Sequence, residues 1–147
     1  MNAASLTEPL SMKYVSISNS GKAEVMHIAT GPLPTIGETD VLIEVQFAGV
    51  NRPDVAQRSG AYAPPPGASP IMGLEVSGIV AAIGVDVKQW QVGDAVCALT
   101  PGGGYAEYCA VSGAHCLPIP RGLSMVEAAG VPENFLRSGS MCLTLAS

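Results

Sequence analysis

Residues 51–78 read NRPDVAQRSGAYAPPPGASPIMGLEVSG, and this stretch is the most informative part of the chain. A mostly apolar run at residues 41–50 precedes it, which is typical of a strand with one face partly exposed. Pro53 suits the first turn of a helix, and Gly60 suits the C-terminal end of that helix. The PPPG cluster at residues 64–67 excludes regular structure. The order predicted here is therefore a strand, a short helix and an irregular loop.

Short β-rich runs bounded by glycine or proline recur along the rest of the chain. The further predicted strands are residues 12–17, 25–28, 75–83, 94–99, 105–111 and 115–119. Residues 19–21 (NSG) predict a hairpin-like turn between the first two of these. The SMVE sequence at residues 124–127 matches a capping box, so a helix is expected to begin near Ser124. The spacing predicts a mainly β, barrel-like antiparallel domain with short helices.

The composition excludes several classes of protein. The chain has 147 residues, about one domain, and its 48% apolar and 13% charged residues exclude disorder and predict apolar surface that something would cover. With a net charge of −5 and no basic run, neither a nucleic acid nor a membrane surface is an expected partner. The chain has no basic, apolar N-terminal signal and no run of about 20 apolar residues, so we expect a cytoplasmic protein.

The cysteines and histidines indicate no zinc site, no disulfide framework and no hydrolase site. The chain contains four cysteines without a CxxC pair, namely Cys97, Cys109, Cys116 and Cys142. Neither a structural zinc site nor a disulfide framework is therefore indicated, and we expect these side chains to be small buried hydrophobic groups. His27 and His115 lie apart from any nucleophile motif, so hydrolase chemistry has no support.

Two residues of the 51–78 stretch are candidates for contact with a ligand. Asn51 follows a predicted buried strand, where its amide could hold a carbonyl or carboxamide group. The alternative is that Asn51 only caps the helix that follows. Tyr62 precedes three prolines and could donate a hydrogen bond to a developing oxyanion. The alternative is that its ring packs on those prolines.

The charged residues nearby have structural explanations as well. Arg52 and Arg58 flank the predicted helix and could balance a phosphate or a carboxylate, or lie on a solvated face. Asp54 is favoured at the first helical turn with or without a catalytic role, and Glu75 could be a paired acid at a strand start. Residues 102–107 (GGGYAE) predict a glycine turn, because a glutamate stands where a dinucleotide-binding loop needs its third glycine.

Five segments together carry a resemblance to a known family. They are AGVNRPDVAQRSGAY at 48–62, PPPGAS at 64–69, GLEVSGIV at 73–80, WQVGDAVCAL at 90–99 and GGGYAEY at 102–108. They resemble the medium-chain dehydrogenase/reductase superfamily, in particular its zinc-independent quinone oxidoreductase branch, the NADPH-dependent relatives of zeta-crystallin. The resemblance implies a GroES-like catalytic domain over residues 12–136, a partly open barrel that is similar to the N-terminal domain of alcohol dehydrogenases.

The resemblance also implies that two domains take part in the reaction, and it implies which residues form the site. In such enzymes a Rossmann domain, not expected within this chain, binds NADPH, and hydride passes to a quinone or similar activated carbonyl compound. Asn51 matches a residue beside the nicotinamide and the substrate, so it is implied in catalysis, substrate binding and cofactor binding. Tyr62 matches a catalytic and substrate-binding residue of the quinone pocket, and Asp54 a residue that orients its neighbours around the substrate.

No metal is expected at this site. The zinc-dependent alcohol dehydrogenases of the same superfamily place a cysteine in the motif that here reads Gly49-Val50-Asn51, and a histidine where Leu74 stands. Glu75 alone cannot hold zinc, which needs about three protein ligands. The alternatives that stay open are an enoyl or alkenal reductase domain and a non-enzymatic interaction module. A homodimer or association with a full-length relative is also open.

The family pattern ends at residues 131–136 (VPENFL), which the family continues with a sequence like TVWxNVFDLG. Reading codons one base earlier, the codon of Gly139 can give tryptophan, and the boundary between Met141 and Cys142 forces valine. We therefore expect a frameshift near Arg137. The expected organisation is a flexible leader at 1–11, the catalytic domain at 12–136 and an aberrant tail at 137–147. Hydride transfer by this chain alone is not expected.

Overall fold

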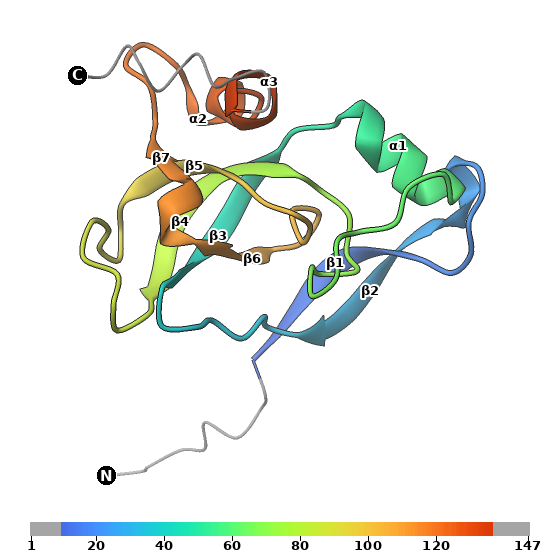
Figure 1. Ribbon diagram of the computed structural model, residues 1–147, viewed down its shortest axis with the longest axis horizontal. Coiled ribbons are helices and arrows are strands. Elements are labelled where there is room, and N and C mark those ends of the chain that lie inside the picture. Colours follow the sequence, from blue (N-terminus) through green and yellow to red (C-terminus); the bar gives the residue numbers. More distant parts are fainter. Residues whose placement is uncertain (1–9, 137–147) are drawn as a thin grey trace, which may run out of the picture.

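The computed structural model describes residues 10–136 as two antiparallel β-sheets with short helices at one end (Figure 1). The strands are β1 (Ser11–Ile17), β2 (Met26–Pro32), β3 (Asp40–Ala48), β4 (Glu75–Ile83), β5 (Ala95–Leu99), β6 (Tyr108–Ser112) and β7 (Cys116–Pro118). The α-helices are α1 (Arg52–Ser59), α2 (Met125–Ala128) and α3 (Pro132–Leu136), and two 3-10 turns lie at Ala23–Val25 and Gly113–His115. The mainly β class with short helices is confirmed.

The sheets do not close into a complete barrel. Strands β1 and β2 form the predicted hairpin, and the second sheet has the order β6-β3-β4-β5-β7, with every pair antiparallel. Backbone hydrogen bonds join the sheets where β1 meets the segment before β6. The Val15 N–H donates to the Tyr105 carbonyl at 2.8 Å, and the Glu107 N–H donates to the Lys13 carbonyl at 3.0 Å. The expected partly open barrel is therefore confirmed.

The hydrophobic core of the described residues lies against the five-stranded sheet and consists of alternate apolar residues of its strands together with Val87 from the loop between β4 and β5. The buried members are Val41, Ile43, Val76, Val80, Val87, Val96, Ala98, Cys109, Val111 and Cys116. Burial of such side chains is the main term that stabilises a domain of this size. Cys97 is buried too, so the three cysteines of the described residues are buried and free, as predicted, and Cys142 lies outside those residues.

Helix α1 begins and ends as predicted. Gly60 adopts the left-handed conformation, with φ of 84°, which a glycine reaches without strain. The next two backbone N–H groups, of Ala61 and Tyr62, both donate to the Ala56 carbonyl, at 2.9 and 3.2 Å. The proline loop therefore leaves the helix in a fixed direction, and Tyr62 sits at its start.

The glycine segment before β6 differs from the predicted strand. β6 begins at Tyr108, three residues later than predicted. The residues before it, 102–105, run beside residues 71–73 instead. Three backbone hydrogen bonds of 2.7–3.1 Å join the two segments. A Cβ at Gly73 would lie 2.5 Å from the Tyr105 nitrogen, so the contact requires glycine. The segment is a glycine turn, as the sequence predicted.

The last helices bring the chain back over the sheet. Ser124 caps α2 as predicted: its hydroxyl accepts the Glu127 N–H at 3.3 Å, and the Glu127 carboxylate accepts the Ser124 N–H at 2.7 Å. Helix α3 was not predicted, because five residues are too few to establish a periodicity.

The two ends of the chain fall largely outside the described residues. Of the predicted leader, residues 1–9 lie outside them, while Ser11 already belongs to β1, one residue earlier than the predicted start of the domain. The predicted frameshifted tail, residues 137–147, lies entirely outside the described residues.

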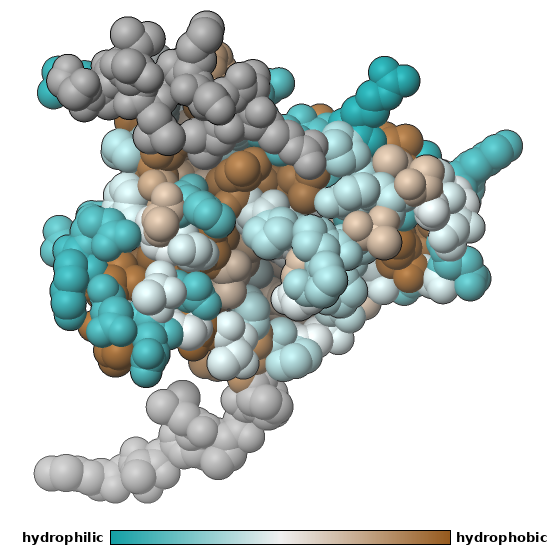
Figure 2. Space-filling model, in the orientation of Figure 1, coloured by the Kyte–Doolittle hydropathy of each residue, from teal (hydrophilic) through white to brown (hydrophobic). Residues whose placement is uncertain are grey.

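Apolar side chains reach the surface, as the composition predicted. Figure 2 shows brown apolar areas between the hydrophilic ones on one face of the molecule. The side chains of Val50 and Ile28 are 79% and 67% exposed. None of the helices of residues 10–136 combines the length and the apolar character needed to cross a membrane.

Candidate functional site

Asn51 lies between β3 and α1 and is held at two points. Its backbone is extended, with φ of −126°, and its N–H donates to the Asp54 carboxylate at 2.8 Å. Its side-chain Nδ2 donates to Oε1 of Glu75, also at 2.8 Å. Asn51 is therefore the N-cap residue of α1, and its side-chain amide donates to a residue of β4.

Glu75 is the buried centre of this arrangement, with a side chain that is only 1% exposed. Its Oε2 accepts the backbone N–H of Glu133, in the first turn of α3, at 2.8 Å. Gly49 packs directly against the carboxylate, and a Cβ there would collide with Oε1. A buried carboxylate is tolerated when hydrogen-bond donors surround it, and here a side-chain amide and a backbone N–H serve both oxygens.

Asp54 joins three segments of the chain and is 4% exposed. Its carboxylate accepts the Asn51 N–H at 2.8 Å, the Gly73 N–H at 3.2 Å and the Tyr105 hydroxyl at 3.0 Å. Burial, followed by the neighbouring Asp54 carboxylate, raises the pKa of the Tyr105 hydroxyl well above its usual value. Tyr105 is therefore a neutral donor at physiological pH. Asp54 therefore supports the backbone around Asn51.

Tyr62 lines a groove of about 240 Å³. The groove is mostly apolar, and its lining comprises Tyr62, Pro65, Leu74, Leu99, Thr100, Pro101, His115 and Glu133. Leu74 lies in this groove with Tyr62, and the next residue, Glu75, accepts the Asn51 amide. Glu133 lines the groove and donates its backbone N–H to the same carboxylate. Leu74, which lines the groove, therefore directly precedes the residue that accepts the Asn51 amide, whereas Asn51 itself does not line the groove.

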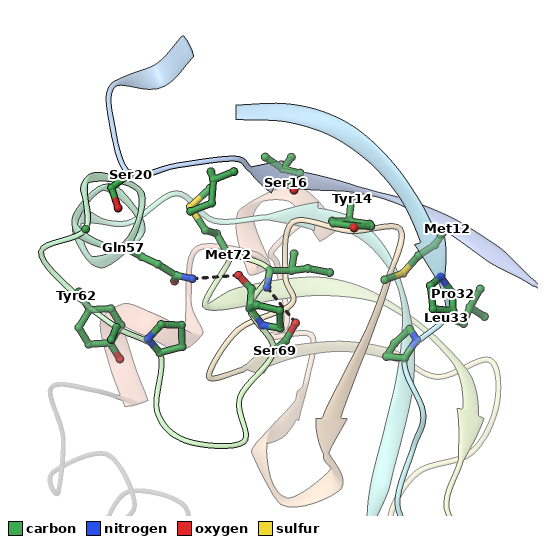
Figure 3. A pocket seen from close by; sticks show the side chains of 18 residues that line it. Met12, Tyr14, Ser16, Ser20, Pro32, Leu33, Gln57, Tyr62, Ser69 and Met72 are labelled. Carbon is green, nitrogen blue, oxygen red and sulfur yellow. Dashed lines mark hydrogen bonds between the residues drawn. The ribbon is translucent and has the colours of Figure 1, made fainter. Parts of the chain in front are cut away.

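A larger cavity, of about 700 Å³, lies between β1 and the loop that follows α1 (Figure 3). Tyr62 stands at its edge, so this ring borders both hollows. The Gln57 side chain, 7% exposed, lines the cavity and donates from Nε2 to the Pro70 carbonyl at 3.3 Å. The sequence did not predict this cavity, because it forms between segments more than 40 residues apart along the chain, such as Met12 and Tyr62.

Neither Arg52 nor Arg58 lines the groove or the larger cavity. The Arg58 Nε donates to the Gly21 carbonyl at 3.2 Å and fastens α1 to the β1–β2 turn, while Arg52 is exposed. The residues that the sequence missed are Tyr105 and Glu133, which support Asp54 and Glu75. The GGGYAEY segment carried a signal for Tyr105, but its contact with Asp54 depends on the glycine turn. Within residues 10–136, no group of three or more His, Cys, Asp or Glu side chains is placed to hold a metal ion.

Comparison with known proteins identifies the domain. Residues 37–121 match the alcohol dehydrogenase GroES-like domain family. The chain belongs to this family. Among its relatives, the quinone oxidoreductase of Lama guanicoe is 35% identical over 125 residues, which are 82% of this chain and 38% of that protein. The synaptic vesicle membrane protein VAT-1 homologue of Danio rerio is 32% identical over 108 residues, 74% of this chain and 22% of that protein.

Solved structures of the superfamily agree with this membership of the GroES-like domain family. The quinone oxidoreductase of Coxiella burnetii superposes with a TM-score of 0.77 at 27% identity, over 86% of this chain and 43% of that chain. The CurK enoyl reductase gives a TM-score of 0.76 at 28% identity, over 86% and 40%. A mycobacterial protein complexed with NADPH gives 0.69 at 30% identity, over 82% and 36%. The GroES-like chain therefore spans less than half of these relatives.

Proposed function

We propose that residues 10–136 form the substrate side of an NADPH-dependent oxidoreductase that reduces quinones or similar activated carbonyl compounds. The observation that carries this proposal is the Asn51–Glu75 hydrogen bond of 2.8 Å, together with the apolar groove lined by Tyr62 and by Leu74, the residue before Glu75. Tyr62 supplies a phenol to this hollow, whose lining contains neither a lysine nor an arginine. Such a hollow suits a planar uncharged substrate with a polarised oxygen.

Asn51 and Tyr62 would act on the carbonyl oxygen of the substrate. NADPH, when bound, supplies the hydride. Asn51 can hold the carboxamide of a nicotinamide or the substrate oxygen with the amide N–H that Glu75 leaves free. The Tyr62 hydroxyl can donate a hydrogen bond to that oxygen as negative charge develops on it. Leu74 and Leu99 contribute apolar walls that exclude water and so strengthen both hydrogen bonds.

Residues 10–136 fit the nicotinamide end of the cofactor better than its pyrophosphate. The first turn of α1, the longest helix of these residues, has its backbone donors next to the Asp54 carboxylate, which would repel a phosphate. The glycines at 102–104 contact residues 69–73 and leave no cradle for phosphate oxygens. We therefore expect the remaining length seen in the relatives to hold most of the cofactor, and residues 10–136 alone to lack hydride transfer.

Two measurements on the 147-residue chain test the function. In the first, 9,10-phenanthrenequinone is observed by saturation-transfer NMR with the wild-type chain and with Tyr62→Ala. We expect transfer from the wild type and a loss of at least half of it in the variant. In the second, NADPH oxidation with the same quinone is followed at 340 nm. If the wild type gives no saturation transfer, the proposed substrate site is contradicted. If the chain oxidises NADPH appreciably, the expectation that it lacks hydride transfer is contradicted.

An enoyl reductase domain is the second candidate, favoured by the similarity to CurK at a TM-score of 0.76. An enoyl thioester also has a polarised carbonyl oxygen, so the same groove could hold it. Competition distinguishes the two candidates: a crotonyl thioester that displaces phenanthrenequinone from the chain at lower concentration than a second quinone supports the enoyl reductase. A non-enzymatic interaction module is the third proposal, and the exposed apolar side chains of Ile28 and Val50 support it.

A further inference from the structure

We propose that Glu75 is a positioning residue that fixes which way round the Asn51 amide stands, so that Asn51 offers an N–H and not an oxygen to a bound carbonyl group. The inference rests on the proposed function for the identity of that carbonyl group. The orientation itself follows from the contacts of Glu75 and can be measured without any ligand.

The two ends of an asparagine amide are nearly equal in size but opposite in chemistry. One end donates two hydrogen bonds and the other accepts them, so a turned amide would repel the carbonyl that it should hold. Packing alone does not distinguish these ends. An ionised carboxylate does, because it accepts hydrogen bonds and has none to donate. Only Nδ2 of Asn51 can therefore face Oε1 of Glu75, at the observed distance of 2.8 Å.

Glu75 is itself prevented from turning. Its second oxygen accepts the Glu133 N–H at 2.8 Å, and a backbone N–H cannot reverse its role. Gly49 closes the remaining side, since even a Cβ at that position would collide with the carboxylate. Glu75 is also buried, with 1% of its surface exposed, so water does not replace these partners. Both carboxylate oxygens of Glu75 therefore accept hydrogen bonds from donors that are held in place.

Asn51 is fixed at its backbone as well. The Asp54 carboxylate holds the Asn51 N–H, and the Tyr105 hydroxyl and the Gly73 N–H hold that carboxylate in turn. The backbone of Asn51 is thus held, and the orientation of its amide is set by Glu75 at Nδ2 and by the capping box, in which the side chain faces the Asp54 backbone N–H. The structure assigns no partner within residues 10–136 to the second N–H of Nδ2. This N–H is the group offered to the ligand.

The substitution Glu75→Gln should reverse the amide. The introduced glutamine would keep its oxygen on the Glu133 N–H, because that position requires an acceptor. Its NH2 group would then face Asn51, and Asn51 would have to present its oxygen to form a hydrogen bond. The substitution Asn51→Asp alone places two carboxylates against each other, which destabilises the fold. The double variant Asn51→Asp with Glu75→Gln restores a donor and an acceptor in the reverse sense.

The test uses nitrogen-15 NMR of the 147-residue chain. The Asn51 side-chain amide is assigned as the signal pair that Asn51→Asp removes. In the wild type we expect one of its two protons to resonate downfield and to exchange slowly with water, because it is bound to a carboxylate. In Glu75→Gln we expect that downfield shift to be lost while the signals of the core remain. An unchanged Asn51 pair in a folded Glu75→Gln chain overturns the proposal.

A second measurement decides the matter if Glu75→Gln does not fold. It compares the melting temperatures of the wild type, Asn51→Asp and the double variant. We expect Asn51→Asp to melt several degrees below the wild type and the double variant to melt above Asn51→Asp. A double variant that melts no higher than Asn51→Asp contradicts a direct pairing of residues 51 and 75 and overturns the proposal.

Adding a carbonyl probe separates this inference from the proposed function. Nicotinamide, and separately 9,10-phenanthrenequinone, are titrated into the wild type and Glu75→Gln. We expect at least one probe to shift the second Asn51 amide proton in the wild type, and the shift to fall at least twofold in Glu75→Gln. If the orientation result holds and neither probe shifts that proton, the proposed function fails at this site while the positioning role of Glu75 stands.

Discussion

The surroundings of Asn51 and of Tyr62 differ in how many hydrogen bonds and how much burial hold them in place. Around Asn51, two buried carboxylates bind five neutral donors from four segments of the chain at 2.8–3.2 Å. Tyr62 stands on a proline loop between two hollows, with its ring only half-buried. The Asn51 side is therefore fixed before any ligand arrives, whereas the Tyr62 side can adapt. Substitutions should change stability on the first side and binding on the second.

The largest effect is expected for Gly49→Ala. Its methyl group would overlap the Glu75 carboxylate, which is locked by Asn51 and Glu133, so we expect a loss of about 3 kcal/mol in the free energy of unfolding. Urea denaturation measures this loss. Gly67→Ala is the matched control: its φ of 82° is strained for alanine, but no atom lies within 4 Å of the added Cβ. A loss of about 1 kcal/mol is expected there, and equal losses would show that the Asn51 side is not tightly packed.

Tyr105→Phe should have the next largest effect. It removes the hydroxyl that donates to Asp54 at 3.0 Å and leaves a buried carboxylate one donor short, so a loss of about 2 kcal/mol is expected. Tyr108→Phe serves as the control, because Tyr108 is also half-buried but makes no hydrogen bond to Asp54. If both variants unfold at the same urea concentration, Tyr105 does not support the site.

Alkaline pH should weaken the fold in two steps. Burial raises the pKa of Cys109 to about 11 and that of Cys116 to about 12, so the folded state holds these protons more tightly than the unfolded state does. Stability is therefore complete below the ordinary thiol pKa of about 8.5 and falls as the pH rises above it. Tyr105 adds a second decline above about pH 10. Melting temperatures measured from pH 8 to pH 11 check the trend, and Tyr105→Phe should lack the second decline.

The smallest effect on stability is expected for Tyr62→Phe. The ring and its packing remain, so the free energy of unfolding should change by less than about 0.5 kcal/mol. Binding of a quinone should weaken by about threefold to tenfold, because one hydrogen bond to the carbonyl oxygen is worth about 1 kcal/mol. Fluorescence or NMR titration measures the affinity. Unchanged affinity would assign Tyr62 the packing role that the sequence left open.

Sequence patterns predicted local structure well and distant contacts poorly. Pro53 and Gly60 were enough to bound α1, and the capping box located α2, because these signals act within one helical turn. The bond between Asn51 and Glu75 depends instead on the register of β3 and β4, which sets Ala48 opposite Val76. Neither residue type reveals that pairing. The predicted start of β6 was wrong because the backbone of Tyr105 packs against Gly73. The glycines that allow this close contact also resemble an ordinary strand boundary.

The central claim is that the groove of Tyr62 and Leu74, next to Asn51, receives the carbonyl substrate. A chemical-shift map of the nitrogen-15-labelled chain with 9,10-phenanthrenequinone tests it most directly. The account predicts the largest backbone and side-chain shifts at Asn51, Tyr62, Leu74 and Leu99. Shifts confined to the larger cavity, at Met12, Leu33 and Ile71, would contradict it and move the substrate site to the other side of Tyr62.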